Sequence, residues 1–297
     1  MPTKRISLRG RTDRMTAVLK ILLTGIIILV LFLLIHAFKL MRMYLVLIDT
    51  RIEFKRFVFA YFRTTLVNLL IPFKLGEVYR VFVFYRLCGN FATGFLSVVV
   101  DRFFDTLALV FVMLPFQILY PDTLSFVSVM LAVFLAVIVF AYMIFPPTYR
   151  YLNKYIILNR VSPRSMAVLK LLNGLKVWYE YVKSLIAGRY ALLLLMSFGA
   201  WFFEGLLFRL LSVFYPYSAF DARGFCEYIT SLLSSVPKTL EQRAYGRMCI
   251  ILTLILTVIS ALICFSRKGP RQILPGDNSE GAYQERHNLL PNRRRKG

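Results

Sequence analysis

The stretch NLLIPFKLGEVYR, residues Asn68–Arg80, decides the fold of this chain. It places a proline, a glycine and three charged side chains between segments that are otherwise hydrophobic. Proline breaks a helix, and a charge at membrane depth costs roughly 2.5 kcal/mol or more unless it is paired or hydrated. A broken helix with intramembrane charges is typical of transporter substrate sites near the bilayer midplane. The alternative is a short interfacial loop whose Lys74, Glu77 and Arg80 reach the headgroups.

The composition indicates an integral membrane protein. Hydrophobic residues make up 58% of the 297 residues and the mean hydropathy is +0.65, which excludes an ordinary soluble domain. The charge is strongly basic, with 37 Lys and Arg against 15 Asp and Glu. In a membrane protein this excess indicates cytoplasmic loops lying against anionic lipid. The four cysteines form no CxxC pair and the two histidines have no ligand spacing, so neither a disulfide framework nor a metal site is predicted.

Long apolar runs recur along the chain, and a spanning helix needs about 20 such residues. They cover residues 18–38, 91–120, 124–145, 190–215 and 250–265. The basic head before the first run, with no cleavage site after that run, indicates an uncleaved anchor. Two further segments, 57–85 and 225–245, are interrupted by Pro72 and Pro237. The sequence predicts an all-α polytopic membrane protein with about six spanning helices and broken or re-entrant segments around these prolines.

Polar segments divide the chain further. We expect an integral membrane domain over residues 1–266 and a basic, disordered cytoplasmic tail over 267–297. Within the membrane domain, residues 163–188 have an apolar stripe at helical spacing with lysines on the other side. This pattern predicts a basic amphipathic helix in the membrane interface.

The distribution of basic residues predicts the orientation. Segment 146–189 has eight basic residues to one acidic, the tail has eight to three, and the head is similarly basic. All three should be cytoplasmic, which gives a multi-pass protein of the inner (cytoplasmic) cell membrane with both termini inside. The basic stretch 39–56 conflicts with six crossings, because that arrangement places it outside. A re-entrant hairpin around Pro72 changes the count, and hydropathy leaves both arrangements open.

The second broken segment is similar to the first. Residues 231–241 and 65–77 each have small and apolar residues, then a proline, a nearby lysine and a glutamate. No residue of the second segment corresponds to Gly76. Inverted repeats with paired broken helices are a recurring transporter design, so an inverted repeat is one interpretation of the chain.

Asn68–Arg80, followed by Asp101, Arg102 and Asp105, resembles the lysylphosphatidylglycerol synthase/flippase membrane-domain family. That family has an Asn, a Pro, a basic-x-Gly-Glu-x-x-Arg run and an acidic-Arg-x-x-Asp run on the next helix. The resemblance extends over most of residues 15–266, although the glycines of the family's second turn are missing around Pro237 and Glu241. It implies a stand-alone membrane domain, and the best-studied members move aminoacylated phosphatidylglycerol between leaflets. The chain has no room for the soluble domain that makes this lipid, so we expect no synthase activity.

The charged residues suggest how a lipid could be held. Asp101 and Asp105 share a helix face, while Arg102 points roughly 100° away. In one hypothesis Arg80 and Arg102 hold a lipid phosphate through their bidentate guanidinium groups. The acids Glu77, Asp101 and Asp105 would then balance them or bind a cationic headgroup. In the alternative, the charges form an internal salt-bridge cluster that stabilises the broken helix and binds nothing. Glu204 either pairs with Arg209 or faces the cavity.

The predicted function is movement of a phospholipid or related lipid-linked anionic substrate between leaflets. The alternative is a scaffold or enzyme partner in lipid, glycolipid or cell-envelope biosynthesis. We expect neither a cofactor nor a nucleic-acid partner. The expected partners are the lipid substrate and the anionic headgroups that contact the basic loops and tail. A second copy of the chain is an open alternative. The sequence contains no Walker-type nucleotide-binding loop, so direct ATP use is not predicted, and it contains no catalytic motif. The candidate substrate-binding residues are Asn68, Pro72, Lys74, Gly76, Glu77, Arg80, Asp101, Arg102, Asp105, Glu204, Pro237 and Glu241.

Overall fold

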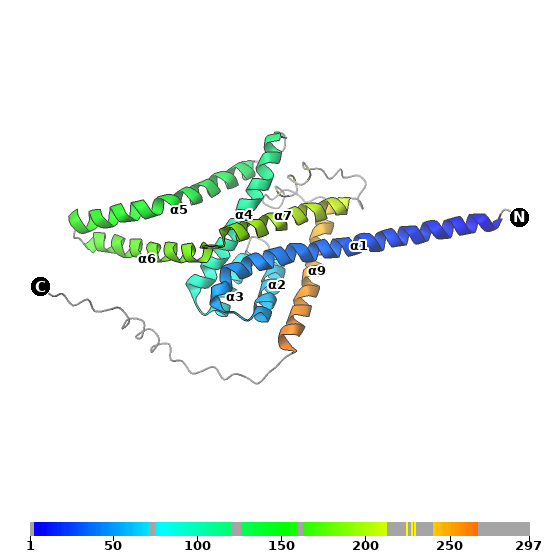
Figure 1. The fold of residues 1–297 in the computed structure, drawn as a ribbon, viewed down its shortest axis with the longest axis horizontal. Coiled ribbons are helices and arrows are strands. Elements are labelled where there is room, and N and C mark those ends of the chain that lie inside the picture. The colour runs from blue at the N-terminus through cyan, green and yellow to red at the C-terminus, as the bar shows by residue number, and fades with distance from the viewer. Residues whose placement is uncertain are drawn as a thin grey trace.

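Every secondary-structure element that the computed structural model describes is helical (Figure 1). It describes residues 3–71, 75–119, 121, 126–159, 163–212, 224, 227, 229 and 240–266. The prediction of an all-α fold is therefore confirmed for this part of the chain. The predictions for the second broken segment, for an inverted repeat and for the tail concern residues outside it.

The helices follow one another with short connections. Their bounds are α1 Thr3–Leu47, the 3₁₀ turn η1 Ile48–Thr50, α2 Phe54–Leu70, α3 Leu75–Cys88, α4 Phe91–Leu119, α5 Phe126–Asn159, α6 Pro163–Ile186, α7 Tyr190–Ser212 and α9 Leu240–Phe265. Within the described helices, four segments are long and apolar enough to cross a membrane: Val18–Thr50, Ser128–Leu158, Tyr190–Leu211 and Arg243–Phe265. These candidate spans support a multi-pass membrane protein.

Two helices run further than their apolar stretches predict. α1 continues beyond residue 38 to Leu47, and α5 continues beyond residue 145 through Pro146 and Pro147 to Asn159. In α1 the polar residues that follow the apolar run lie inside the protein, where other helices supply their partners. A charge after an apolar run therefore does not mark the end of this helix.

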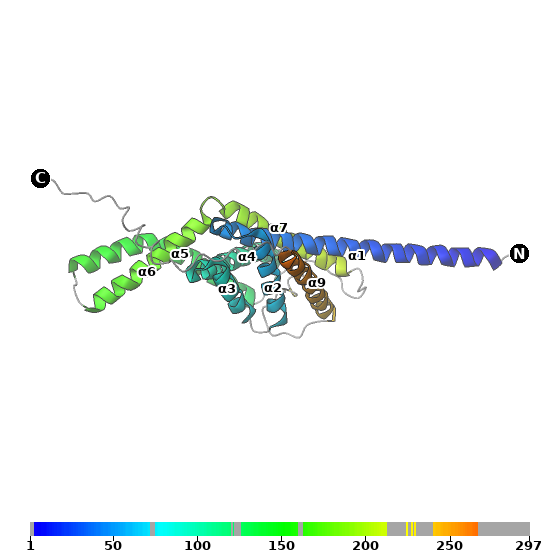
Figure 2. The ribbon, with the colours of Figure 1, turned by 90° about the horizontal axis from the view of Figure 1, so that it is seen from below.

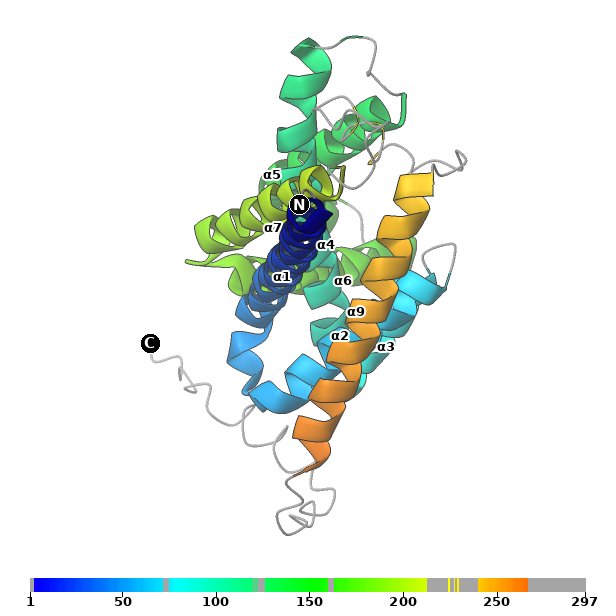
Figure 3. The ribbon, with the colours of Figure 1, turned by 90° about the vertical axis from the view of Figure 1, so that its right-hand side faces the viewer.

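α1 and α7 pack side by side in opposite directions (Figures 1 and 3). At one end of the pair, Arg189 donates to both carboxylate oxygens of Asp49 at 2.8 and 2.9 Å. These hydrogen bonds raise the pKa of Arg189 above its ordinary value. Further along, the ring centroids of Phe38 and Phe203 lie 5.4 Å apart. The end of α1 and the turn between α6 and α7 thus occupy the same end of the molecule.

This packing separates two segments that the charge pattern predicts on one side of the membrane. The basic head begins α1, which is unbroken over 45 residues, a length of roughly 65 Å. The turn at residues 187–189 lies beside the other end of that helix. The head and this turn are therefore at opposite ends of α1, and the basic stretch at the end of α1 lies with the turn.

α2 and α3 form a helical hairpin, here called the α2–α3 hairpin, that packs against α4 and α9. Its two helices approach so closely that a Cβ atom on Gly76 would lie 2.4 Å from Cα of Asn68. A Cβ on Gly94 of α4 would lie 2.5 Å from the backbone nitrogen of Tyr85. With 17 and 14 residues, α2 and α3 are about 25 and 21 Å long, shorter than a hydrocarbon core of about 30 Å.

α5 and α6 form a second antiparallel pair that extends away from the other helices (Figures 1 and 2). The rings of Tyr142 and Tyr179 lie 4.8 Å apart, and the Tyr149 hydroxyl donates to Asn173 at 2.7 Å. The predicted helix at 163–188 is present as α6, Pro163–Ile186. It is packed on α5 through these contacts.

α1 is the centre of the packing. Its Phe32 belongs to an apolar cluster with residues of α4, α7 and α9. Its Met43 belongs to a second cluster with α2 and α3, and its Val46 to a third with α4, α6 and α7. The polar face of the same helix is consequently surrounded by protein.

Candidate functional site

The polar face of α1 brings three ionisable residues into the centre of the bundle. His36, Lys39 and Arg42 are spaced by three residues, which places them along one side of the helix. The sequence analysis missed Lys39 and Arg42, because they follow an apolar run as a basic flank usually does. The available signal was that the apolar pattern resumes after Arg42 and continues to Leu47.

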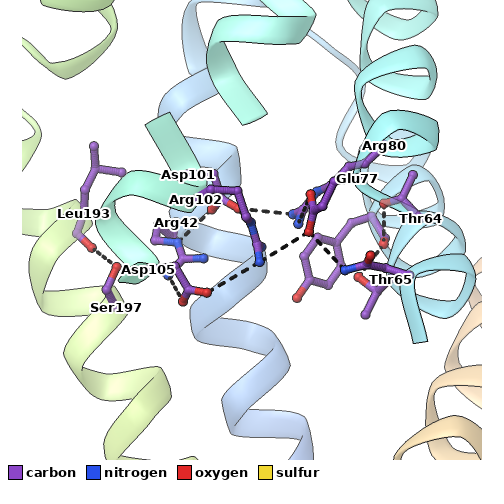
Figure 4. Close-up of polar contacts among 12 residues, drawn as sticks. Arg42, Thr64, Thr65, Glu77, Arg80, Asp101, Arg102, Asp105, Leu193 and Ser197 are labelled. Atoms are coloured by element: carbon purple, nitrogen blue, oxygen red, sulfur yellow. Dashed lines mark hydrogen bonds and ion pairs between the residues drawn. The ribbon is translucent and has the colours of Figure 1, made fainter. Parts of the chain in front are cut away.

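Arg42 is fully buried and joins α1 to α4 and α7 (Figure 4). Its Nε donates to Asp101 at 2.7 Å, and its Nη1 donates to Asp105 at 2.6 Å and to the Ser197 hydroxyl at 3.0 Å. Asp101 and Asp105 share a face of α4, as their spacing predicts, and the guanidinium of Arg42 contacts both of them. The pairing compensates two carboxylates that the membrane interior would otherwise expel.

Asp101 contacts three arginines from three helices. Besides Arg42, it lies 3.3 Å from Nη2 of Arg80 on α3 and 3.0 Å from Nη2 of Arg102 on its own helix. Arg102 also reaches Asp105 at 3.5 Å. Although Arg102 starts about 100° from the acids around the helix axis, its long side chain turns back to both of them.

Glu77 forms the outer edge of the charge cluster. Its Oε1 accepts a hydrogen bond from Nδ2 of Asn68 at 3.0 Å, which links α2 to α3 near the tip of the hairpin. Its ion pairs are longer, 3.6 Å to Arg102 and 4.0 Å to Arg80. The side chains of Glu77 and Arg102 are 23% and 38% exposed, whereas Arg80 is only 5% exposed. Among these residues Arg102 and Glu77 are therefore the most accessible charges.

Gly76 contributes close packing. The sequence predicts it as part of the helix break, but it is buried inside α3, and the interruption lies between Leu70 and Leu75. The absence of a side chain lets α3 meet the backbone of Asn68. That approach places Glu77 within hydrogen-bonding distance of Asn68.

A second ion pair adjoins the cluster. Nζ of Lys39 lies 2.7 Å from Oε2 of Glu204 on α7 and 5.4 Å from the centre of the Trp201 ring. The indole of Trp201 donates to the backbone oxygen of Asp105 at 3.1 Å. Glu204, for which the sequence suggests either pairing with Arg209 or exposure to the cavity, thus forms an ion pair with Lys39. It also accepts a hydrogen bond from the Tyr245 hydroxyl at 3.5 Å.

The complete cluster is electrically balanced. Lys39, Arg42, Arg80 and Arg102 face Glu77, Asp101, Asp105 and Glu204. A simple phosphate pocket requires that Arg80 and Arg102 outweigh the acids. These contacts do not form such a pocket, because the cluster has no net positive charge. An anion entering this site must displace a carboxylate from an arginine or bring a positive charge with it.

Several buried polar atoms of the cluster have no hydrogen-bond partner within the described residues. They are Nη2 of Arg42, Nε of Arg80, Nε of Arg102 and Oε2 of Glu77. Leaving such groups unpaired costs free energy, about 1–3 kcal/mol each and more for charged groups. Three donors and one acceptor of the cluster are therefore left without a hydrogen-bond partner among the described residues.

The structure brings together eight of the twelve predicted site residues: Asn68, Gly76, Glu77, Arg80, Asp101, Arg102, Asp105 and Glu204. Pro72, Lys74 and Pro237 lie outside the described residues, and so does the side chain of Glu241. Lys39, Arg42, Ser197 and Trp201 are additions from the structure.

Comparison with known proteins gives one result. The family described as "Lysylphosphatidylglycerol synthase TM region" matches residues 11–237. This range covers well over half of the chain and includes every charged residue of the cluster. No curated protein and no solved structure matches the chain.

Proposed function

Because the chain belongs to the lysylphosphatidylglycerol synthase transmembrane-region family, we propose that it moves a phospholipid or related lipid-linked anionic substrate between the leaflets of the cell membrane. The observation that supports this function most is the balanced charge cluster among apolar helices, with Arg102 and Glu77 exposed at its edge. Buried charges inside a membrane protein mark substrate pathways more often than they mark packing.

The distances suggest a division of labour within the cluster. Arg42, which is itself fully buried, holds Asp101 and Asp105 at 2.7 and 2.6 Å, so in this proposal these three residues form a permanent framework. The contacts of Glu77 with Arg102 and Arg80 are 3.6 and 4.0 Å long, and they are the ones that a headgroup can replace. In this proposal a lipid phosphate replaces Glu77 as the partner of the Arg102 guanidinium. The carboxylate of Glu77 then accepts a hydrogen bond from a donor group of the same headgroup.

We propose further that the α2–α3 hairpin is re-entrant. Both helices are too short to cross alone, and their close packing at Gly76 keeps them paired. A hairpin that enters and leaves on one side puts the beginning of α2, the end of α3 and the α6–α7 turn on the same side. The basic residues Lys55, Arg86 and Arg189 favour the cytoplasmic side for this end.

Single introduced cysteines test this topology. On a cysteine-free background, we expect Lys55→Cys and Met166→Cys, both exposed, to react with an impermeant thiol reagent only after the cells are opened. Ser7→Cys at the far end of α1 should react in intact cells, because one unbroken helix separates it from the other two positions. Reaction of the first two positions from opposite sides would rule out the re-entrant hairpin.

The transport proposal is tested with Arg102. Arg102→Gln should lower leaflet-to-leaflet movement of a labelled phosphatidylglycerol in proteoliposomes about 10- to 100-fold, since charge-assisted hydrogen bonds contribute about 1.5–3 kcal/mol. The loss of one cation also unbalances the cluster and should lower the yield of folded protein. The matched control is Arg86→Gln, an exposed arginine of the same hairpin that should keep wild-type transport.

A double substitution separates binding from folding. Arg102→Gln/Glu77→Gln leaves three cations and three acids, and it leaves the contacts of Arg42 intact. This variant should recover the yield of folded protein and still fail to move the lipid. The scaffold alternative, in which the cluster only stabilises the fold, predicts instead that this double variant behaves like wild type in every assay.

A further inference from the structure

Segment 146–159 of α5 and the whole of α6 form a two-helix arm beyond the bundle, here called the α5–α6 arm (Figures 1 and 2). The arm is held together by its own contacts. Lys176 lies 5.0 Å from the ring centre of Tyr149, and Phe145 stacks on Tyr179 at 5.1 Å. The arm is joined to the bundle where Tyr181 donates to Thr93 of α4 at 2.7 Å.

The surface of the arm is basic. Its exposed cationic side chains outnumber its acidic ones; they are Arg150, Lys154, Lys170, Lys176 and Lys183, against Glu180. On α5, Arg150 and Lys154 are four residues apart and therefore lie on the same face. Tyr151 and Tyr155 follow the same spacing next to them, with their rings 6.2 Å apart.

The same two helices also expose large apolar side chains. Leu158 on α5 and Leu171 on α6 are 68% and 65% exposed, and Val177 is similarly exposed. The apolar groups alternate with lysines and tyrosines along both helices. At a membrane surface such side chains separate by polarity. Methylene and aromatic groups lie below the headgroups, and ammonium groups lie among the phosphates.

We infer that the α5–α6 arm contacts the anionic surface of the leaflet on its side of the membrane, with Arg150, Lys154 and the tyrosines beside them in the headgroup layer where α5 leaves the apolar core. The argument is charge complementarity combined with exposed apolar groups on the same helix, where Leu158 follows Arg150 and Lys154 at a spacing of four residues and Tyr151 and Tyr155 lie next to them. Each basic residue near such a surface contributes roughly fivefold to the binding constant. This contact is independent of the charge cluster and of whether the protein transports a lipid.

The experiment uses the full chain in nanodiscs that hold one copy each. A polarity-sensitive fluorophore is attached to Leu158→Cys after the native cysteines are replaced. Iodide in the water and bromine on the lipid chains report whether the probe faces water or lipid. The discs contain either phosphatidylcholine alone or phosphatidylcholine mixed with phosphatidylglycerol.

With phosphatidylglycerol present, we expect bromine to quench the probe and iodide access to fall several-fold. High salt should reverse this change. Arg150→Gln/Lys154→Gln should return the probe to water, whereas the matched control Lys55→Gln/Arg86→Gln should not. If iodide reaches the probe equally well in both lipid mixtures, the arm faces water or a protein partner and the proposal is wrong. The proposal is also wrong if the probe is equally shielded in both mixtures, or if the control pair has the same effect as Arg150→Gln/Lys154→Gln.

Discussion

Replacing Arg42 with Met is expected to abolish the accumulation of folded protein. The substitution removes the closest cation from Asp101 and Asp105, and it leaves Arg80 and Arg102 to compensate both acids together with Glu77. Breaking one partner out of a buried ion pair costs about 3–5 kcal/mol, because the remaining charge stays buried without compensation. That amount is comparable to the whole stability of many domains.

The measurement is the fraction of detergent-extracted protein that elutes as a single species after heating. Lys55→Gln, which removes an exposed cation next to the end of α1, is the matched control and should be close to wild type. Arg42→Met/Asp105→Asn restores the charge balance and should recover part of the loss. A melting curve of Arg42→Met that overlays the wild type would contradict the framework role of this arginine.

Substituting Gly76 is expected to have the second-largest effect. Even Gly76→Ala places a Cβ atom 2.4 Å from Cα and 2.5 Å from Oδ1 of Asn68. The backbone atom cannot move aside unless α2 and α3 separate, and overpacking of this kind costs about 1–3 kcal/mol. Gly76→Leu should be worse. Both variants should lose the Asn68–Glu77 hydrogen bond and, with it, the position of Glu77 at the edge of the site.

Gly174→Ala is the matched control for this experiment. Gly174 is an exposed helical glycine of α6, and a Cβ there meets nothing within 4 Å. This variant should be unchanged or more stable by about 0.5–1 kcal/mol, because alanine favours the helix over glycine. The comparison uses melting temperature in detergent together with lipid movement in proteoliposomes. Equal behaviour of Gly76→Ala and Gly174→Ala would show that the hairpin tolerates a wider spacing.

The sequence was sufficient for the class of fold and for much of the cluster. Apolar run lengths predicted α4 and α7 within a few residues, and the amphipathic spacing of 163–188 predicted α6. The charges inside apolar segments identified Glu77, Arg80, Asp101, Arg102 and Asp105. These residues could be identified from the sequence because an unpaired charge inside the membrane costs free energy, so a charge within an apolar segment must have a partner. Local spacing also placed Asp101 and Asp105 on one face of α4, where both contact Arg42.

The rest depended on packing between distant helices. Lys39 and Arg42 follow an apolar run, and local sequence cannot distinguish a flank at the membrane edge from a charge that α4 and α7 cover. The role of Gly76 was assigned to the helix break, because its close contact with Asn68 exists only when α2 and α3 pack together. The side on which each basic segment lies also depended on the pairing of α1 with α7.

The pairing of Lys39 with Glu204 sets a condition on how the chain is made. The two residues are 165 positions apart, and at 5–20 residues per second the ribosome needs roughly 10 to 30 s to pass from one to the other. The time between the synthesis of Arg42 and that of Asp101 is shorter, because only 59 positions separate them. During biosynthesis α1 therefore holds two unmatched positive charges before their acids exist. The insertion machinery must keep this helix in a hydrated or protein-lined setting until α4, and then α7, has been synthesised.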